Sequence, residues 1–313
     1  MARLNNRMTA AAGAALLLLL MVPAVVFAYA NIQYPASVGV GKPFVVRVTS
    51  AAPLEKISAV WQGRTIPLDI SIWNEKYISL GLFGTQVGKV KPGVSRMRIV
   101  METPGGGKKQ ADISIRVRAI KYREDHLTLP EKMVTPPKSV LNRIAAERKE
   151  TGRALSVLTV SRNWGLPLVR PVGGIVTSPY GRRRILNKKP RNHHGGVDFR
   201  AAVGTPVKAA LPGRVVLTGD HYYAGKSVYV DSGGGVISHY FHLDSIAVSE
   251  GDVISPGKTI GKSGNTGRST GPHLHFGLSI AGQMVDSFPL FDTTIAGMLK
   301  DTALKRVELT GRQ

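Results

Sequence analysis

Two histidines one residue apart, His273 and His275, lie in the segment GPHLHFG near the end of the chain. In a β-strand alternate residues point to the same face, so these imidazoles would project side by side while Leu274 points into a core. Imidazoles placed in this way can bind a metal ion, transfer protons, or do one of each. The segment therefore predicts a site of metal or acid–base chemistry.

The other histidines gather in the same part of the chain. Seven of the eight fall between His193 and His275, and the segment HHGGVDF places His194 four residues before Asp198. The two glycines between them favour a loop that enters a strand over a helix. This histidine, the aspartate and one histidine of the HLH pair make a three-ligand site with an open fourth position, which is typical of catalytic zinc. Such a zinc would activate water and polarise a carbonyl. The segment SHYFHL adds His239 and His242, of which a strand would direct at most one into the site.

The composition limits this chemistry further. The chain has 313 residues, 43% of them hydrophobic, which is enough for two ordinary domains. Cysteine is absent, so a metal must be held by His, Asp or Glu, and neither a disulfide nor a cysteine nucleophile is available. The formal net charge of +22 predicts a polyanionic partner.

The first thirty residues have the features of an export signal. Arg3 and Arg7 precede an uncharged segment, residues 8–30, that ends in the small-x-small sequence Ala28-Tyr29-Ala30. Because the apolar stretch is long enough to cross a bilayer, the alternative is an uncleaved membrane anchor. In both cases we expect an exported protein of the periplasm or cell envelope. Its polyanionic partner would then be cell-wall polymer, lipopolysaccharide or an anionic membrane surface rather than nucleic acid.

The elements that must position these side chains divide into three further regions. Residues 31–120 carry alternating apolar and polar runs, and they predict a β-sandwich of immunoglobulin type. Residues 121–165 form a linker in which helical spacing from about Lys138 predicts a connecting helix. Short β-runs and glycine-rich turns return in residues 166–313, without a long helical pattern before the last twenty residues. We therefore expect a mainly β chain whose C-terminal domain is antiparallel.

Three segments in order, HHGGVD, YFHL and GPHLHFG, resemble the signature segments of the lysostaphin-like, LytM-type or beta-lytic zinc metallopeptidases. TSPYGRRR, GTPVKAALPGRVV and GNTGRSTGPHLHF extend the similarity, which covers roughly residues 171–290. The resemblance implies a zinc endopeptidase that hydrolyses peptide cross-links of peptidoglycan, with meso-diaminopimelate cross-links in a Gram-negative periplasm. The alternative is a non-catalytic envelope module that binds peptidoglycan or activates another hydrolase.

Site roles follow from the same resemblance. His194, Asp198 and His275 correspond to the zinc ligands, whereas His242 and His273 correspond to unligated catalytic histidines whose division of labour stays open. Many members also have glutamate directly after HLHF, where this chain has glycine, at a position that is not a ligand.

Two further groups are candidates for substrate binding. Tyr222 or Tyr223, in a loop before the strand SVYVD, could donate a hydrogen bond to the tetrahedral oxyanion. Arg182, Arg183 and Arg184 belong to a basic run that precedes the first predicted ligand. They are expected either to lie in a solvated loop or to bind carboxylates of the peptide substrate. His193, His221 and His239 are interpreted as surface residues or neighbours of the site.

Overall fold

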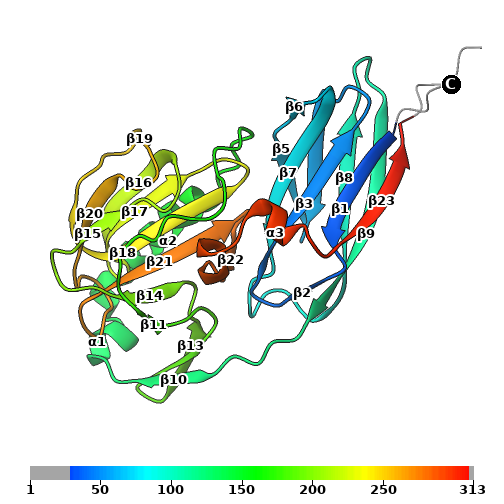
Figure 1. The fold of residues 1–313 in the computed structure, drawn as a ribbon. Coiled ribbons are helices and arrows are strands. Elements are labelled where there is room, and N and C mark those ends of the chain that lie inside the picture. The colour runs from blue at the N-terminus through cyan, green and yellow to red at the C-terminus, as the bar shows by residue number, and fades with distance from the viewer. Residues whose placement is uncertain (1–28, 310–313) are drawn as a thin grey trace, which may run out of the picture.

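The computed structural model describes residues 29–309 of the chain. Two β-rich lobes lie side by side, joined by a linker that carries the longest helix (Figure 1). The prediction of a mainly β chain is confirmed. The predicted export signal lies outside the described residues except for Tyr29 and Ala30. Within residues 29–309, no helix is both long and apolar enough to cross a membrane.

The N-terminal lobe consists of two five-stranded sheets. One sheet has the order β23 (Thr302–Glu308), β1 (Tyr29–Pro35), β3 (Pro43–Ser50), β7 (Lys76–Gly84) and β6 (Ser71–Trp73). The other has the order β2 (Ser37–Gly39), β9 (Lys108–Arg118), β8 (Gly93–Glu102), β4 (Lys56–Trp61) and β5 (Arg64–Leu68). In β9 every second side chain is buried, as the alternation predicts, so one face of the sheet forms part of a hydrophobic core.

The last strand corrects the predicted domain boundary. β23 pairs antiparallel with β1 along its full length, from Tyr29↔Glu308 to Pro35↔Thr302. The sequence predicts that residues 166–313 form the C-terminal domain, without a long helical pattern before the last twenty residues. In β23, however, Val307 packs against the core of the N-terminal lobe. The chain therefore returns to the first lobe and completes its sheet (Figure 1).

The linker holds α1 (Glu131–Val134), a 3₁₀ turn at Lys138–Val140 and α2 (Leu141–Ala154), which lies where the connecting helix is predicted. It also contributes structure to the second lobe. β10 (Glu124–Leu127) pairs in parallel with β12 (Arg183–Leu186), which pairs with β13 (Lys189–His193). This small sheet brings the linker next to the segment that precedes the predicted ligands.

The C-terminal lobe is built on a ten-stranded sheet that is antiparallel throughout. Its main path is β11 (Val176–Ser178), β14 (Val197–Arg200), β21 (His273–Ile280), β18 (Val236–Ile246), β17 (Gly225–Asp231), β16 (Gly213–His221) and β19 (Val253–Ile254). The sheet also includes β15 (Pro206–Lys208), β20 (Thr259–Ser263) and β22 (Gln283–Val285), and it is followed by a 3₁₀ turn at Phe288–Phe291 and α3 (Ile295–Met298). The side chains of Leu274 and Phe276 are fully buried in its core.

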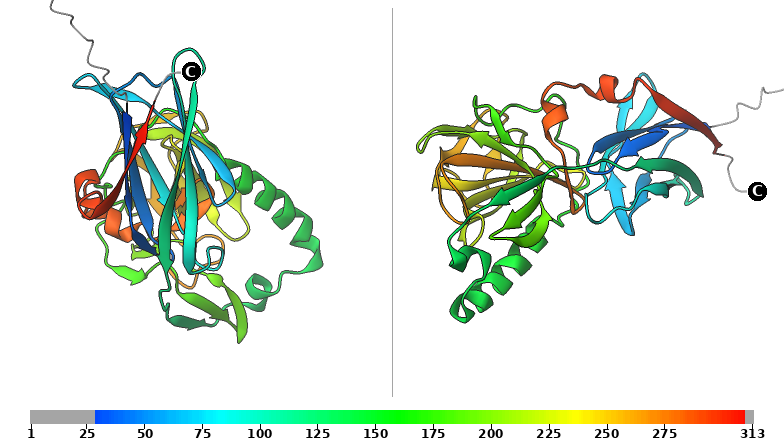
Figure 2. Two further views of the ribbon diagram at one scale, coloured as in Figure 1. Left: turned by 90° about the vertical axis from the view of Figure 1, so that its right-hand side faces the viewer. Right: turned by 90° about the horizontal axis from the view of Figure 1, so that it is seen from below.

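The two lobes share an interface of polar and apolar contacts, and the views in Figure 2 show them adjoining. Lys42 forms an ion pair of 2.5 Å with Asp286, and Arg64 donates to the carbonyl of Ala281 at 2.8 Å. Val45 and Leu82 of the first lobe belong to the hydrophobic core of the second. The N-terminal lobe is therefore packed against the C-terminal one rather than tethered by the linker alone.

Candidate metal centre

Two neighbouring strands and one loop converge on a buried site. In the register of β14 and β21, Asp198 lies directly opposite His275. His194 is in the loop that joins β13 to β14, where its backbone N–H donates to the Arg182 carbonyl at 2.7 Å. The three side chains form a group that could hold a metal ion.

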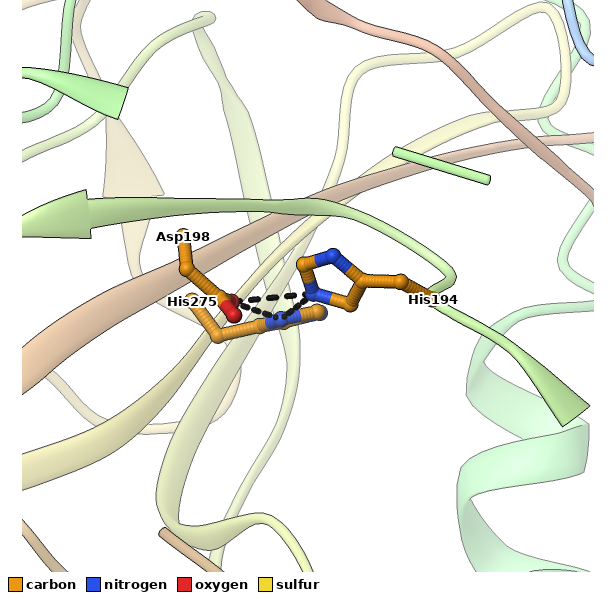
Figure 3. A group of neighbouring side chains, drawn as sticks. All are labelled: His194, Asp198 and His275. Carbon is orange, nitrogen blue, oxygen red and sulfur yellow. Dashed lines mark hydrogen bonds and ion pairs between the residues drawn. The ribbon is translucent and has the colours of Figure 1, made fainter. Parts of the chain in front are cut away.

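The three side chains approach one another through one atom each (Figure 3). Oδ1 of Asp198 lies 2.9 Å from Nε2 of His194 and 2.8 Å from Nδ1 of His275. The two imidazole nitrogens are 2.9 Å apart. All three residues are buried, so a charge that forms among them is shielded from water.

The hydrogen bonds around the group fit a bound cation. Nδ1 of His194 lies 3.0 Å from the Pro179 carbonyl and donates to it, so Nε2 turns its lone pair toward Asp198 and His275. Burial, partly offset by Asp198, lowers the pKa of His275 to about 4, which makes this imidazole neutral near pH 7. Burial opposes ionisation of Asp198, but the two histidines outweigh it and hold its pKa well below the usual range. Two imidazole nitrogens and one carboxylate oxygen form a donor set that suits zinc.

Arg184 fixes the second oxygen of the carboxylate. Its Nη2 donates to Oδ2 of Asp198 at 2.9 Å, which leaves Oδ1 facing the histidines. The sequence analysis considered this arginine only for substrate binding. The contact joins β12 to β14 in three dimensions, and no local spacing in the sequence signals it.

The other two predicted residues lie beside this group. Nδ1 of His242 donates to the Thr266 carbonyl and Nδ1 of His273 donates to the Gly271 carbonyl, both at 2.8 Å. The Nε2 atoms of both rings are therefore left with the lone pair, and Nε2 of His273 lies 3.7 Å from Oδ1 of Asp198. The two ring centroids are 4.7 Å apart. Burial, aided by the neighbouring His273 and His275, lowers the pKa of His242 to about 3, so this ring is neutral and can accept a proton.

His239 explains why glycine follows HLHF in this chain. It lies directly opposite Gly277 in the register of β18 and β21. A Cβ atom on Gly277 would stand 1.9 Å from Nε2 of His239, so no larger residue fits there without displacing the ring. The buried His239 ring also lies near Phe241 and His275, with centroid distances of 4.7 and 6.0 Å. His239 is thus part of the packing behind a predicted ligand, and it is not a surface residue.

Two substrate-binding predictions are corrected by the contacts of these side chains. Tyr222 donates its hydroxyl to the Lys132 carbonyl at 2.5 Å, so this group is not free to bind an oxyanion. Arg182 is ion-paired with Asp125, and Arg183 with Glu124 at 3.2 Å. Arg182 and Arg183 are therefore paired with two acidic residues of β10, whereas Arg184 contacts Asp198. The pairing with β10 has no signature in the sequence, because the acidic residues lie in the linker.

The remaining histidines do not join the group. Nδ1 of His221 lies 2.8 Å from the Ser227 hydroxyl. His193 is partly buried, and its ring lies close to Gly88 of the N-terminal lobe. Tyr223 packs beneath Arg268, whose guanidinium lies 4.3 Å from the centre of the ring.

A cleft of about 330 Å³ opens beside the metal-binding group. Its apolar lining comes from Leu127, Leu129 and Leu186. Its polar lining includes Asp198, His273, Arg184 and Arg268. The cleft therefore offers both apolar and polar contacts to a peptide that lies beside the candidate metal site.

Comparison with known proteins agrees with this site. Residues 192–287, which include all five predicted ligand and catalytic positions, match the model of Peptidase family M23. A solved structure described as a putative peptidase M23 from Pseudomonas aeruginosa is 29% identical, with a TM-score of 0.59 over 79% of this chain and 92% of that one. That match extends over both lobes.

Curated relatives are similar over about a third of the chain. The chain is 46% identical over 94 residues to peptidoglycan DD-endopeptidase ShyA of Vibrio cholerae, which is 30% of this chain and 22% of that protein. It is 39% identical over 111 residues to the DD-carboxypeptidase/endopeptidase Mpg of Neisseria meningitidis, which is 36% of this chain and 26% of that protein. Lysostaphin of Staphylococcus simulans is 43% identical over 97 residues, 30% of this chain and 19% of that protein. The aligned part thus spans about a quarter or less of each relative.

Proposed function

Since this chain carries a domain of peptidase family M23, we propose that it is a zinc-dependent endopeptidase that hydrolyses peptide cross-links of peptidoglycan. The observation that carries the proposal is the buried convergence of His194, Asp198 and His275 beside a peptide-sized cleft. The names of the curated relatives, which include peptidoglycan endopeptidases, supply the substrate class.

In this proposal the three converging side chains hold the metal, and Arg184 holds the free oxygen of Asp198 in place. Zinc, when bound, supplies a Lewis acid that polarises the scissile carbonyl and increases the acidity of water. Fixing the second carboxylate oxygen restrains the rotation of Asp198, which keeps the ligand geometry constant during turnover.

His242 and His273 carry the proton transfers. Because both Nδ1 atoms donate to backbone carbonyls, protons are exchanged at the Nε2 atoms. One ring takes a proton from the attacking water, and a protonated ring delivers one to the leaving amine. Nε2 of His273 lies 3.7 Å from Oδ1 of Asp198, which places this ring next to the metal-binding group.

We further propose that the protein acts in the periplasm or cell envelope. Its substrate is a wall polymer, and its net charge of +22 suits anionic polymers or an anionic membrane surface. The N-terminal region, 31–120, would act as a binding or spacing module next to the peptidase domain, 166–313, with the last strand returned to the first sheet.

The test is digestion of a purified, cross-linked muropeptide dimer by the full chain, with products identified by mass spectrometry. A peptidase yields two monomers whose summed mass exceeds the dimer by one water. A chelator should stop the reaction. A dimer that stays intact while the protein binds intact sacculi would support the non-catalytic alternative instead.

A further inference from the structure

A second arginine, Arg268, lines the cleft and takes no part in the catalytic steps proposed above. It belongs to the segment GNTGRSTG that precedes the HLH strand. Within residues 29–309, no carboxylate forms an ion pair with it. A partly buried guanidinium that lacks an internal counter-ion is costly unless a ligand supplies one.

The position of Arg268 is fixed by its surroundings. Its guanidinium lies over the ring of Tyr223 at 4.3 Å, and its backbone N–H donates to the Tyr223 carbonyl at 2.9 Å. Tyr223 packs edge-on against Tyr222, with ring centroids 5.1 Å apart. Tyr222 is in turn anchored to the Lys132 carbonyl. These contacts therefore hold the Arg268 cation in place in the cleft. The loss of side-chain conformational entropy when it binds a ligand is correspondingly small.

The neighbours of Arg268 are also cationic. Burial lowers its pKa, and the charges of Arg184 and Arg191 lower it further. Arg184 has one buried donor, Nε, without a hydrogen-bond partner. Asp125, the other acid of the cleft besides the metal-binding one, is already ion-paired with Arg182. The cleft therefore presents to whatever enters a cation, Arg268, that has no carboxylate partner among the described residues.

We infer that Arg268 forms a carboxylate-binding subsite, so that the peptide bound in the cleft carries a free carboxylate close to its scissile amide. The inference rests on the proposed function for the identity of the reaction. A planar guanidinium binds a carboxylate through two parallel N–H donors, which fixes orientation as well as charge. Arg268 is the substrate-binding residue to test, because Arg184 also holds Asp198 and its replacement would disturb the metal site.

The experiment compares two probes on the metal-loaded full chain: a cross-linked muropeptide dimer, and the same dimer with its free carboxylates converted to carboxamides. Cleavage is measured as kcat/KM, and binding of both probes is measured separately by calorimetry. The wild-type protein should prefer the acid by about 10- to 100-fold, the range expected for a charge-assisted pair in a cleft. Arg268→Gln should treat the two probes alike, and Arg268→Lys should retain part of the preference.

Lys188→Gln is the matched control, since it removes one charge from an exposed turn near the cleft and should keep the wild-type preference. Equal values of kcat/KM for acid and carboxamide in the wild-type protein would overturn the subsite, as would a preference that survives in Arg268→Gln. Should the wild-type protein cleave neither probe, the proposed function fails, and calorimetry then decides the subsite alone. In that case, binding that does not distinguish the two probes overturns it.

Discussion

At the scale of single residues, the site is defined by which nitrogen each histidine directs inward. His194 binds a backbone carbonyl through Nδ1 and presents Nε2, whereas His275 presents Nδ1 to the same point. His242 and His273 both bind carbonyls through Nδ1. Three of these four imidazoles thus bind a carbonyl through Nδ1, whereas His275 directs Nδ1 toward Asp198.

Replacement of His275 by alanine should remove the metal together with the activity. The side chain supplies one of only three converging donor atoms, and the remaining His194 and Asp198 cannot complete a three-ligand site. Metal analysis of the purified variant checks this directly. A variant that retains one equivalent of zinc would show that His275 is not a ligand.

His242→Ala and His273→Ala should keep zinc and lose turnover. Neither ring belongs to the converging donor set, but both present Nε2 beside it. Loss of a general acid–base group costs on the order of 10² to 10⁴ in rate. Zinc content and kcat are measured on the same preparations, and a variant that turns over at the wild-type rate has no catalytic histidine at that position.

At the scale of elements, short-range register accounts for much of the site. The alternation of His273 and His275 in β21, and the pairing of Asp198 with His275, follow from two adjacent antiparallel strands. The sequence could therefore predict these side chains together. It could not predict that β10 binds Arg182 and Arg183, or that β23 pairs with β1, because those contacts join distant segments whose pairing depends on the whole fold.

The pairing of β18 with β21 explains why residue 277 is glycine, and it leads to a prediction about stability. Gly277→Ala should lower the free energy of unfolding by about 3 kcal/mol, the upper end for overpacking a core, because the new Cβ would overlap the ring of His239. Adding His239→Ala should recover part of the loss, since it vacates that space. Gly165→Ala, with no atom within 4 Å of its Cβ position, is the matched control and should change little.

These differences are measured by denaturant unfolding. The wild-type protein is compared with the two single variants, the double variant and the control. Strictly additive effects of Gly277→Ala and His239→Ala would contradict the steric account, because residues that compete for one space must be energetically coupled.

At the scale of the whole molecule, the positive net charge should govern binding of the protein to the cell wall. The net charge is +22, and attraction between exposed charges is screened over about 10 Å at 0.1 M salt and about 3 Å at 1 M. Binding to purified sacculi should therefore weaken strongly as salt rises, while cleavage of a short soluble peptide falls much less. Pull-down over a salt series, beside the peptide assay, compares the two. Binding that stays constant would assign attachment to specific contacts of the N-terminal lobe.

The comparisons with known proteins also cover the two lobes to different extents. The family model matches residues 192–287 of the C-terminal lobe, which holds the candidate metal centre, whereas the match to the Pseudomonas aeruginosa structure covers 79% of the chain. The ion pair of Lys42 with Asp286 and the hydrogen bond of Arg64 to the second lobe hold the two together. The candidate metal centre thus belongs to one lobe, and the other lobe is packed against it.

The central claim is that a metal held by His194, Asp198 and His275 is required for hydrolysis of peptidoglycan cross-links. The most direct measurement is cleavage of the muropeptide dimer by chelator-treated protein as zinc is added back in known amounts. The account predicts no cleavage without metal and a rise that ends near one zinc per chain, with no recovery in His275→Ala at that amount. Full cleavage by protein shown to contain no metal would contradict it.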